Sequence, residues 1–186
     1  MDVLEAIRTR RSIGRLEGDV AESDLREFVE AATWAPNHKL TQPWTFTVLR
    51  GDARVRFGEA WAAVLASESA LEGEERAAFL RREAGKPLRA PVLVIASTRT
   101  DADPVVALED YAATAAAVQN FLLAAWARGY GAMWRTGAIA YAPAIKAHLG
   151  LAADDRVVGI VYLGRPGMAP PKAQPRETAG VMRVLD

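Results

Sequence analysis

The chain contains no cysteine among its 186 residues. This absence excludes disulfide bonds, thiolate metal sites, thiol nucleophiles and iron–sulfur ligation. Histidine is nearly absent too: His38 and His148 are the only two, which excludes a histidine-rich metal site. There is no net charge, because 23 basic residues balance 23 acidic ones. The chain therefore has no bulk positive field to bind nucleic acid or an anionic membrane.

No apolar run is long enough to cross a bilayer. The longest runs from Tyr111 to Ala127 and is interrupted by Gln119 and Asn120, whereas a span needs about 20 mostly apolar residues. The N-terminal stretch MDVLEAIRTRRS lacks an apolar core of signal-peptide length. We therefore expect a cytoplasmic protein with no membrane or nucleic-acid partner.

The composition, 51% apolar and 25% charged, is that of a globular chain, and the length suits a single domain over residues 1–186. Predicted strands are few and separated by helices, so the fold class is α+β or α/β, with helices on both faces of a small sheet. Strands are predicted at 44–49, 91–97, 130–134 and 156–163, with a further strand at 181–185 after a proline-rich extended tail. Helices are predicted at 2–9, 23–34, 52–66, 74–84, 105–128 and 141–149, with Ser23 as an N-cap and Pro143 in a first turn.

The predicted helix at 105–128 is long for a chain of this size. Its length is about 36 Å at 1.5 Å per residue, and a chain of this length has a radius of gyration of about 16 Å. The segment is apolar almost all round. Such a helix either crosses the middle of a monomer or is shared with a partner subunit, and both interpretations stay open.

The triplet Arg10-Arg11-Ser12 is the first candidate binding site. Two guanidiniums and a hydroxyl within three residues suit a phosphate, because arginine pairs bidentately with phosphate oxygens. A helix C-terminus precedes the triplet and repels anions, so side chains would have to hold the phosphate. Arginines in this position also cap carbonyl groups and face water. On the triplet alone, this second interpretation is favoured.

The loop APNHKLTQPW at 35–44 is the second candidate. It joins a predicted helix to a predicted strand, where binding residues tend to lie, and it offers His38, Lys39 and Gln42 as polar groups. The competing interpretation makes His38 a solvated loop residue and Trp44 the start of a core strand.

The segment GYGAMWRTGA at 129–138 is the third candidate. Gly131 and Gly137 permit close approach of the backbone to a flat or phosphorylated ligand. The segment lacks the spacing of a dinucleotide fold and the Walker lysine, and the chain has no HExxH or GxSxG motif. The competing interpretation makes Trp134 a core aromatic and Arg135 an exposed charge.

The order and spacing of these segments together resemble the nitroreductase family of FMN-dependent oxidoreductases, in its small single-domain NAD(P)H nitroreductase branch. The matching segments are RRSIGRL at 10–16, APNHKLTQPW at 35–44, GYGAMWRTGA at 129–138 and VVGIVYLGRP at 157–166. The likeness runs from Met1 to about Pro166. It is specific for the family and much less so for a substrate.

The resemblance implies an α+β fold whose central, mostly antiparallel sheet is flanked by helices on both faces, with an extended C-terminal tail. It also implies a homodimer with one FMN in each of two interface clefts. Arg10, Arg11 and Ser12 are then expected to hold the FMN phosphate and ribityl chain. His38 would reach the flavin of the other subunit, and Trp134, Arg135 and Thr136 would line the isoalloxazine.

The activity implied is alternating hydride transfer, in which NAD(P)H reduces the flavin and a small acceptor such as a nitroaromatic or a quinone is reduced in turn. The flavin carries this chemistry, so no catalytic side chain and no metal is predicted. Neither the acceptor nor a preference for NADH or NADPH can be assigned.

Two positions depart from the family pattern, and three other functions stay open. Gly14 stands where many larger relatives carry a lysine, and Trp34 where the nearest branch often has an arginine; both bear on flavin tuning. The alternatives are a different FMN reaction, such as reductive dehalogenation with a lid at 67–86, a flavin-sequestering dimer, and a structural domain without flavin.

Overall fold

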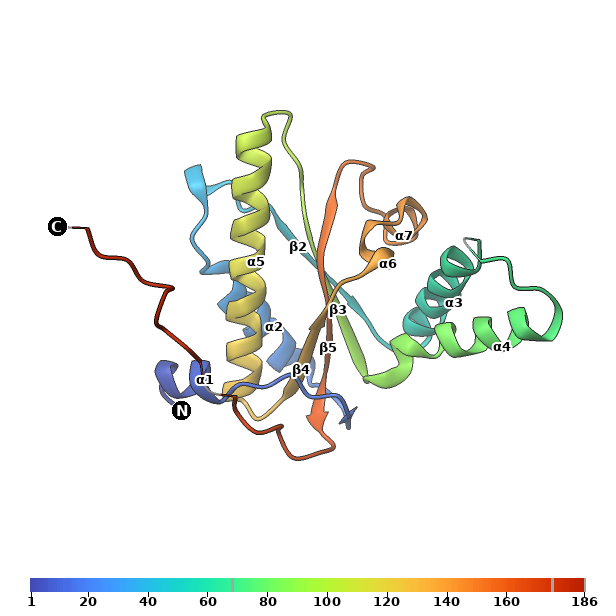
Figure 1. The fold of residues 1–186 in the computed structure, drawn as a ribbon, viewed down its shortest axis with the longest axis horizontal. Coiled ribbons are helices and arrows are strands. Elements are labelled where there is room, and N and C mark those ends of the chain that lie inside the picture. The colour runs from blue at the N-terminus through green and yellow to red at the C-terminus, as the bar shows by residue number, and fades with distance from the viewer. Residues whose placement is uncertain (68, 175, 186) are drawn as a thin grey trace.

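Strand β5 (Arg156–Pro166) is the centre of the sheet in the computed structural model, which describes residues 1–67, 69–174 and 176–185 (Figure 1). Strands β1 (Leu16–Glu17), β3 (Val92–Thr98) and β4 (Gly131–Arg135) all pair with it antiparallel. Strand β2 (Trp44–Leu49) pairs antiparallel with β3. The predicted α+β class and the mostly antiparallel sheet are confirmed.

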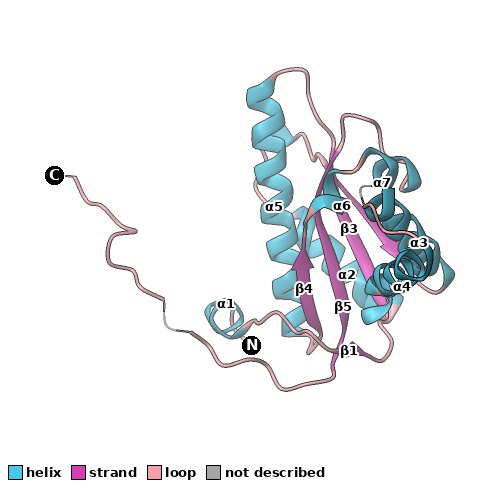
Figure 2. Cartoon of the chain, turned by 45° about the vertical axis from the view of Figure 1, so that its right-hand side comes forward, coloured by secondary structure: helices cyan, strands magenta, loops and turns pink. Residues whose placement is uncertain are grey.

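The sheet is covered on both faces, which explains why β3 is an unbroken apolar run. Successive side chains of a strand point to opposite faces. Accordingly, Val92 and Val94 belong to the core on one face, and Leu93 and Ile95 to the core on the other. Figure 2 shows α5 (Pro104–Ala127) with α2 (Glu22–Thr33) on one side, and α3 (Asp52–Ser67) with the short α6 (Ala138–Tyr141) and α7 (Pro143–His148) on the other.

Helix α5 begins and ends where its sequence signals predict. The Asp103 carboxylate accepts a hydrogen bond from the Val105 N–H at 2.8 Å, Pro104 occupies the first turn, and Gly129 follows the helix with a φ of 74°. The helix lies against one face of the sheet and does not cross the middle of the fold (Figure 1).

Helix α5 buries one face against the sheet and leaves apolar residues exposed on another. Ala113, Ala117 and Phe121 are buried against the sheet, whereas Val105 and Leu108 are 61% and 67% exposed. No helix of the described residues is both long and apolar enough to span a bilayer.

The remaining helical elements are α1 (Val3–Thr9), α4 (Gly73–Ala84) and the short 3-10 helices η1 (His38–Leu40) and η2 (Lys86–Arg89). Helix α2 starts one residue before the predicted Ser23 cap, with Ala21 as its N-cap and no side-chain cap. The helix predicted at 141–149 is α7, which starts at Pro143, a residue suited to a first turn. The short α6 before it was not predicted.

After β5 the described chain forms an extended tail that leaves the sheet (Figures 1 and 2). The strand predicted at 181–185 is wrong: these described residues form no strand, because no other strand pairs with them, and Val181 and Leu185 are 79% and 76% exposed. Pro175, one of the prolines on which the tail was predicted, lies outside the described residues.

Candidate functional site

Residues 10–13 lie along the edge of β4 that β5 leaves open. The Ile13 N–H donates to the Ala132 carbonyl at 3.1 Å, and Ser12 forms a parallel bridge with the same residue. Helix α1 holds the segment from the other side, because the Trp126 indole N–H donates to the Thr9 hydroxyl at 3.0 Å. Two of the three predicted segments, 10–12 and 129–138, are therefore adjacent.

The guanidinium of Arg11 caps the preceding helix, as the competing interpretation expected. It donates to the carbonyls of Arg8 and Arg10 at 2.9 and 2.7 Å. Burial, and secondly the charge of Arg11, lower the pKa of the half-buried Arg10 guanidinium. Neither arginine contacts a carboxylate among the residues that the structure describes.

A depression of about 520 Å³ opens at this triplet, and its described lining includes cations but no acidic side chain. The tail supplies part of the lining, since Lys172 and Arg176 face the same space as Arg10 and Arg11. The sequence analysis missed both tail residues, because neither stands in a motif. Several positive charges without carboxylates are the donor set that a phosphate dianion requires.

His38 lies at the opposite end of α5. Its Nδ1 is 2.6 Å from the Glu109 carboxylate, and the Thr41 hydroxyl donates to Asp110 at 2.6 Å. Lys39, Leu40 and Gln42 have φ values of 52°, 54° and 43°, a strained region for residues other than glycine. These two contacts with α5 hold the loop in that conformation. An open depression of about 510 Å³ lies between His38 and the helix.

A single chain keeps His38 far from the arginine triplet. Glu109 contacts His38 and Trp126 contacts the end of α1. The 17 residue steps from Glu109 to Trp126 correspond to about 25 Å of helix. One protomer therefore does not bring the first two predicted segments together.

The third segment sends its side chains to both faces of the sheet. The Trp134 indole N–H donates to the Val158 carbonyl at 3.2 Å, and its ring packs over Gly159 in the core on the α5 side. Arg135 lies on the other face, with Cζ 5.6 Å from the Tyr162 ring centre. Thr136 and Gly137 are exposed, and the Gly137 φ of 111° suits glycine. Residues 136–138 are therefore the exposed part of this segment, whereas Trp134 is only partly buried.

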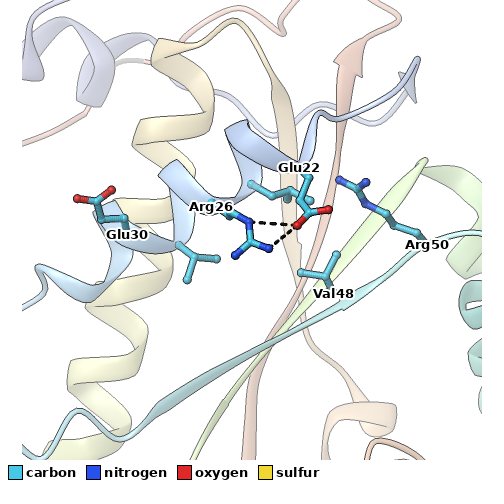
Figure 3. Close-up of a pocket in the computed structure, with 7 residues that line it drawn as sticks. Glu22, Arg26, Glu30, Val48 and Arg50 are labelled. Carbon is cyan, nitrogen blue, oxygen red and sulfur yellow. Dashed lines mark hydrogen bonds and ion pairs between the residues drawn. The ribbon is translucent and has the colours of Figure 1, made fainter.

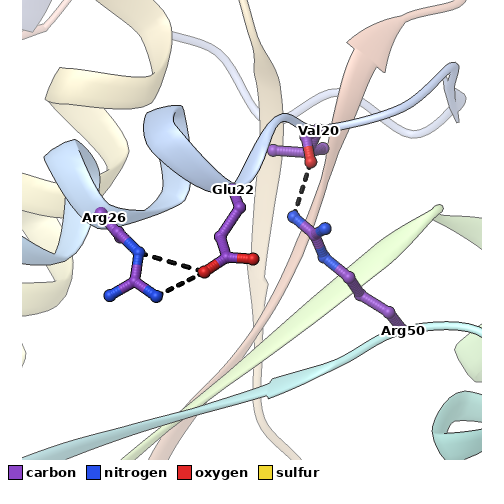
Figure 4. A network of polar contacts seen from close by, with 4 residues as sticks. All are labelled: Val20, Glu22, Arg26 and Arg50. Atoms are coloured by element: carbon purple, nitrogen blue, oxygen red, sulfur yellow. Dashed lines mark hydrogen bonds and ion pairs between the residues drawn. The ribbon is translucent and has the colours of Figure 1, made fainter.

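A depression of about 620 Å³ between α2 and β2 contains none of the predicted site residues (Figure 3). Its walls are largely apolar, and its guanidiniums are already engaged: Arg26 pairs with Glu22, and Arg50 donates to the Val20 carbonyl at 2.6 Å (Figure 4). Glu30 points away from that network (Figure 3). Among the described lining residues, the Arg50 Nε is buried without a partner, but the other charged groups are paired or point away, which separates this depression from the one at the triplet.

Comparison with known proteins identifies the family to which the chain belongs. Residues 7–165 match the model of the nitroreductase family, so the chain belongs to that family of oxidoreductases. An Escherichia coli K12 protein named "Putative NAD(P)H nitroreductase YdjA" is 33% identical over 168 residues, 89% of each chain. The resemblance drawn from the sequence is thereby confirmed.

Two solved structures extend the comparison to three dimensions. A nitroreductase-like family protein from Bacillus cereus superposes with a TM-score of 0.87 at 30% identity, over 100% of this chain and 97% of the other. A Desulfovibrio desulfuricans protein, described as a "putative nitroreductase in complex with fmn", has a TM-score of 0.71 at 27% identity, over 100% and 98%. The second protein binds FMN.

Proposed function

We propose that this chain is an FMN-dependent oxidoreductase that uses NAD(P)H to reduce small acceptors such as nitroaromatics or quinones by alternating hydride transfer. The observation that carries the proposal is the cation-lined depression at Arg10 and Arg11, beside the open edge of β4. Membership of the nitroreductase family supports it. We further propose that residues 1–186 act as one FMN-binding domain. The cytoplasmic location stays a prediction from the sequence.

The residues at the triplet fit the phosphate end of FMN. Arg10 and Arg11 supply positive charge that no described carboxylate neutralises, and Ser12 adds a hydroxyl donor. The negative end of α1 is adjacent, so these side chains must outweigh its repulsion. Lys172 and Arg176 reinforce the charge from the tail.

The residues at the end of β4 fit the ring of the cofactor. Trp134 fixes the strand in the core, and Arg135 and Thr136 carry the backbone onward to the exposed Gly137. In this proposal the backbone of residues 134–136 lines the isoalloxazine, and the FMN, when bound, supplies the hydride-transfer chemistry. The protein holds and orients the ring and keeps its open face accessible to nicotinamide and acceptor in turn.

We propose in addition that the site is completed by a second copy of the chain. The stretch of α5 between Glu109 and Trp126, about 25 Å of helix, argues for this. A two-fold axis near the middle of α5 would place His38 of the partner subunit near Arg10. The exposed Val105 and Leu108 on α5 supply apolar surface for the contact.

The test is a comparison of FMN with riboflavin, which lacks the phosphate. A charge-assisted hydrogen bond contributes about 1.5–3 kcal/mol. Arg10→Ala or Arg11→Ala should therefore weaken FMN binding by about one to two powers of ten and barely affect riboflavin. Ser12→Ala should cost less. Arg15→Ala is the matched control, because Arg15 is exposed and pairs with Glu17 at 3.5 Å.

If the arginine variants lose the same affinity for FMN and for riboflavin, Arg10 and Arg11 do not bind the phosphate. Anaerobic titration with NADH and NADPH, followed by a nitroaromatic and a quinone, tests the reaction itself. A protein that binds FMN tightly, yet whose flavin neither nicotinamide bleaches, would be a sequestering dimer and not an oxidoreductase.

A further inference from the structure

The Tyr162 hydroxyl is a buried polar group that none of the preceding proposals uses. Tyr162 is 3% exposed, and its hydroxyl has no hydrogen-bond partner within the described part of the chain. Burying a hydroxyl without a partner is unfavourable, and such groups in folded proteins normally find one. Tyr162 is one of the residues that line a cavity of about 190 Å³ between β4, β5 and η2.

Two arginines share this cavity with the tyrosine. Arg135 reaches it from β4 and Arg89 from the end of η2. Neither forms an ion pair or a side-chain hydrogen bond in the described ranges. Burial raises the pKa of the Tyr162 phenol, while the charges of Arg135 and Arg89 act in the opposite direction. The Arg135 Cζ lies 5.6 Å from the Tyr162 ring centre, and Arg89 lines the same cavity.

The rest of the lining is apolar and small. Ile13, Leu16 and Met133 form the walls, and no acidic residue is among the described lining residues. Gly14 also lines the cavity, and a Cβ there would meet only the Met133 methyl at an ordinary 3.8 Å. The volume is well below the 300–1,000 Å³ typical of sites for drug-sized ligands, so the ligand must be small.

We propose that this cavity binds a small carboxylate with a short apolar tail, such as acetate or propionate. Guanidinium groups match a carboxylate bidentately, and the phenol of Tyr162 can donate to one of its oxygens. The apolar walls suit the tail. The cavity is distinct from the phosphate cluster at Arg10 and Arg11, and it shares Arg135 with the segment proposed to line the flavin ring.

The experiment uses the protein as purified, labelled with ¹³C at the ζ carbon of its four tyrosines, with the Tyr162 signal assigned by its loss in Tyr162→Phe. Sodium acetate should shift the Tyr162 signal saturably, whereas sodium chloride at equal ionic strength should not. Arg89→Gln should weaken the apparent affinity about tenfold or more. Arg81→Gln, an equal charge change at an exposed position of α4, should leave the affinity unchanged.

Three results would overturn the proposal: no saturable shift at Tyr162, an Arg89→Gln affinity equal to that of the unchanged protein, or tighter binding of phosphate than of acetate. If Tyr162→Phe does not fold, the Tyr162 signal can be assigned as the one that shifts in Arg89→Gln. Arg89 is exposed, so this variant should still fold. Flavin content measured on the same samples keeps this test separate from the proposed function, since neither the readout nor the variants depend on hydride transfer.

Discussion

Gly159 shows how closely the residues behind the third segment are packed. It lies in the middle of β5 under the indole ring of Trp134, and a Cβ built on it would be 2.1 Å from the indole nitrogen. The indole ring is therefore held by two contacts: its close packing against Gly159, and its N–H hydrogen bond to the Val158 carbonyl. The position of the exposed backbone at 136–137 depends on that anchor.

We therefore expect Gly159→Ala to displace Trp134 and to lower the free energy of unfolding by about 1–3 kcal/mol, the usual cost of overpacking a core. Urea denaturation monitored by tryptophan fluorescence measures both effects. Gly14→Ala is the control, because its Cβ would meet only the Met133 methyl at an ordinary 3.8 Å; its change should stay within about 0.5 kcal/mol. Equal stability of Gly159→Ala and the parent would show that the ring is not held in this way.

The residues that the sequence could identify are those that stand side by side in it. Arg10, Arg11 and Ser12 form one cluster before any folding is known. Arg89 and Tyr162 come together only because η2 and β5 meet in space, and Tyr162 stands inside an apolar run that reads as core. No local pattern predicts such a pair.

Helix α4 packs against α3, although the sequence analysis placed it in a candidate lid at 67–86. Gly58 of α3 allows the two helices to touch, because a Cβ there would lie 2.3 Å from the Ala84 carbonyl oxygen. At the end of α4, Glu83 is 3% exposed and pairs with Lys86 and with Arg82, the latter at 3.3 Å. These contacts tie α4 and η2 together and argue against a freely moving lid over the described residues of this segment.

Glu83 should make the stability of the protein depend on pH. Burial alone would raise the pKa of its carboxyl, but the hydrogen bonds from Lys86 and Arg82 outweigh burial and hold the pKa below its ordinary value of 4.5. A lowered folded-state pKa gives stability that is present above the unfolded-state pKa and is lost as the pH falls through the folded-state value. The unfolding free energy should therefore fall on acidification below about pH 4.5.

Glu83→Gln should cost about 1–2 kcal/mol at pH 7, less than for a fully buried pair because both cations are partly in water. It should also flatten the acid loss of stability. Urea titrations between pH 3 and 7 test this, with Glu59→Gln on an exposed position of α3 as the control. A Glu83→Gln curve parallel to that of the parent protein would contradict the assignment.

Elements could be predicted where local signals and tertiary packing agree. Asp103, Pro104 and Gly129 delimit α5, and the apolar run at 92–98 is β3. Residues 181–185 have a strand-like composition, but a strand exists only with a partner, which no local pattern can supply. For the same reason, β1 went unpredicted: it is two residues long and forms because β5 extends far enough to pair with it.

At the scale of the whole molecule, the proposed site needs two chains. We expect the protein to sediment as a flavin-loaded dimer, and Leu108→Glu to shift it toward monomer with loss of FMN, because the charge would be placed in the proposed apolar contact. Val55→Glu, at a 41% exposed position of α3 away from α5, is the control. A stable flavin-loaded monomer would contradict the proposal that the site is shared between two chains.

Mixed dimers test the sharing directly. One chain carries His38→Ala and the other Arg11→Ala. With shared sites, the mixed dimer has one intact site and one doubly damaged site, so half of the FMN should bind with parental affinity. If each chain builds its own site, both sites are singly damaged. Unchanged FMN occupancy in His38→Ala alone would count against a role for His38.

The central place of β5 has a consequence for how the chain is made. Strands β1, β3 and β4 all pair with a strand that begins only at Arg156. Translation proceeds at about 5–20 residues per second, so the stretch from the end of β3 to the end of β5 takes roughly 3–14 s to synthesise. During that time β3 has no neighbour on its β5 side, and its edge stays unpaired on the nascent chain. The native sheet can close only after its central strand, the last to be translated, has left the ribosome.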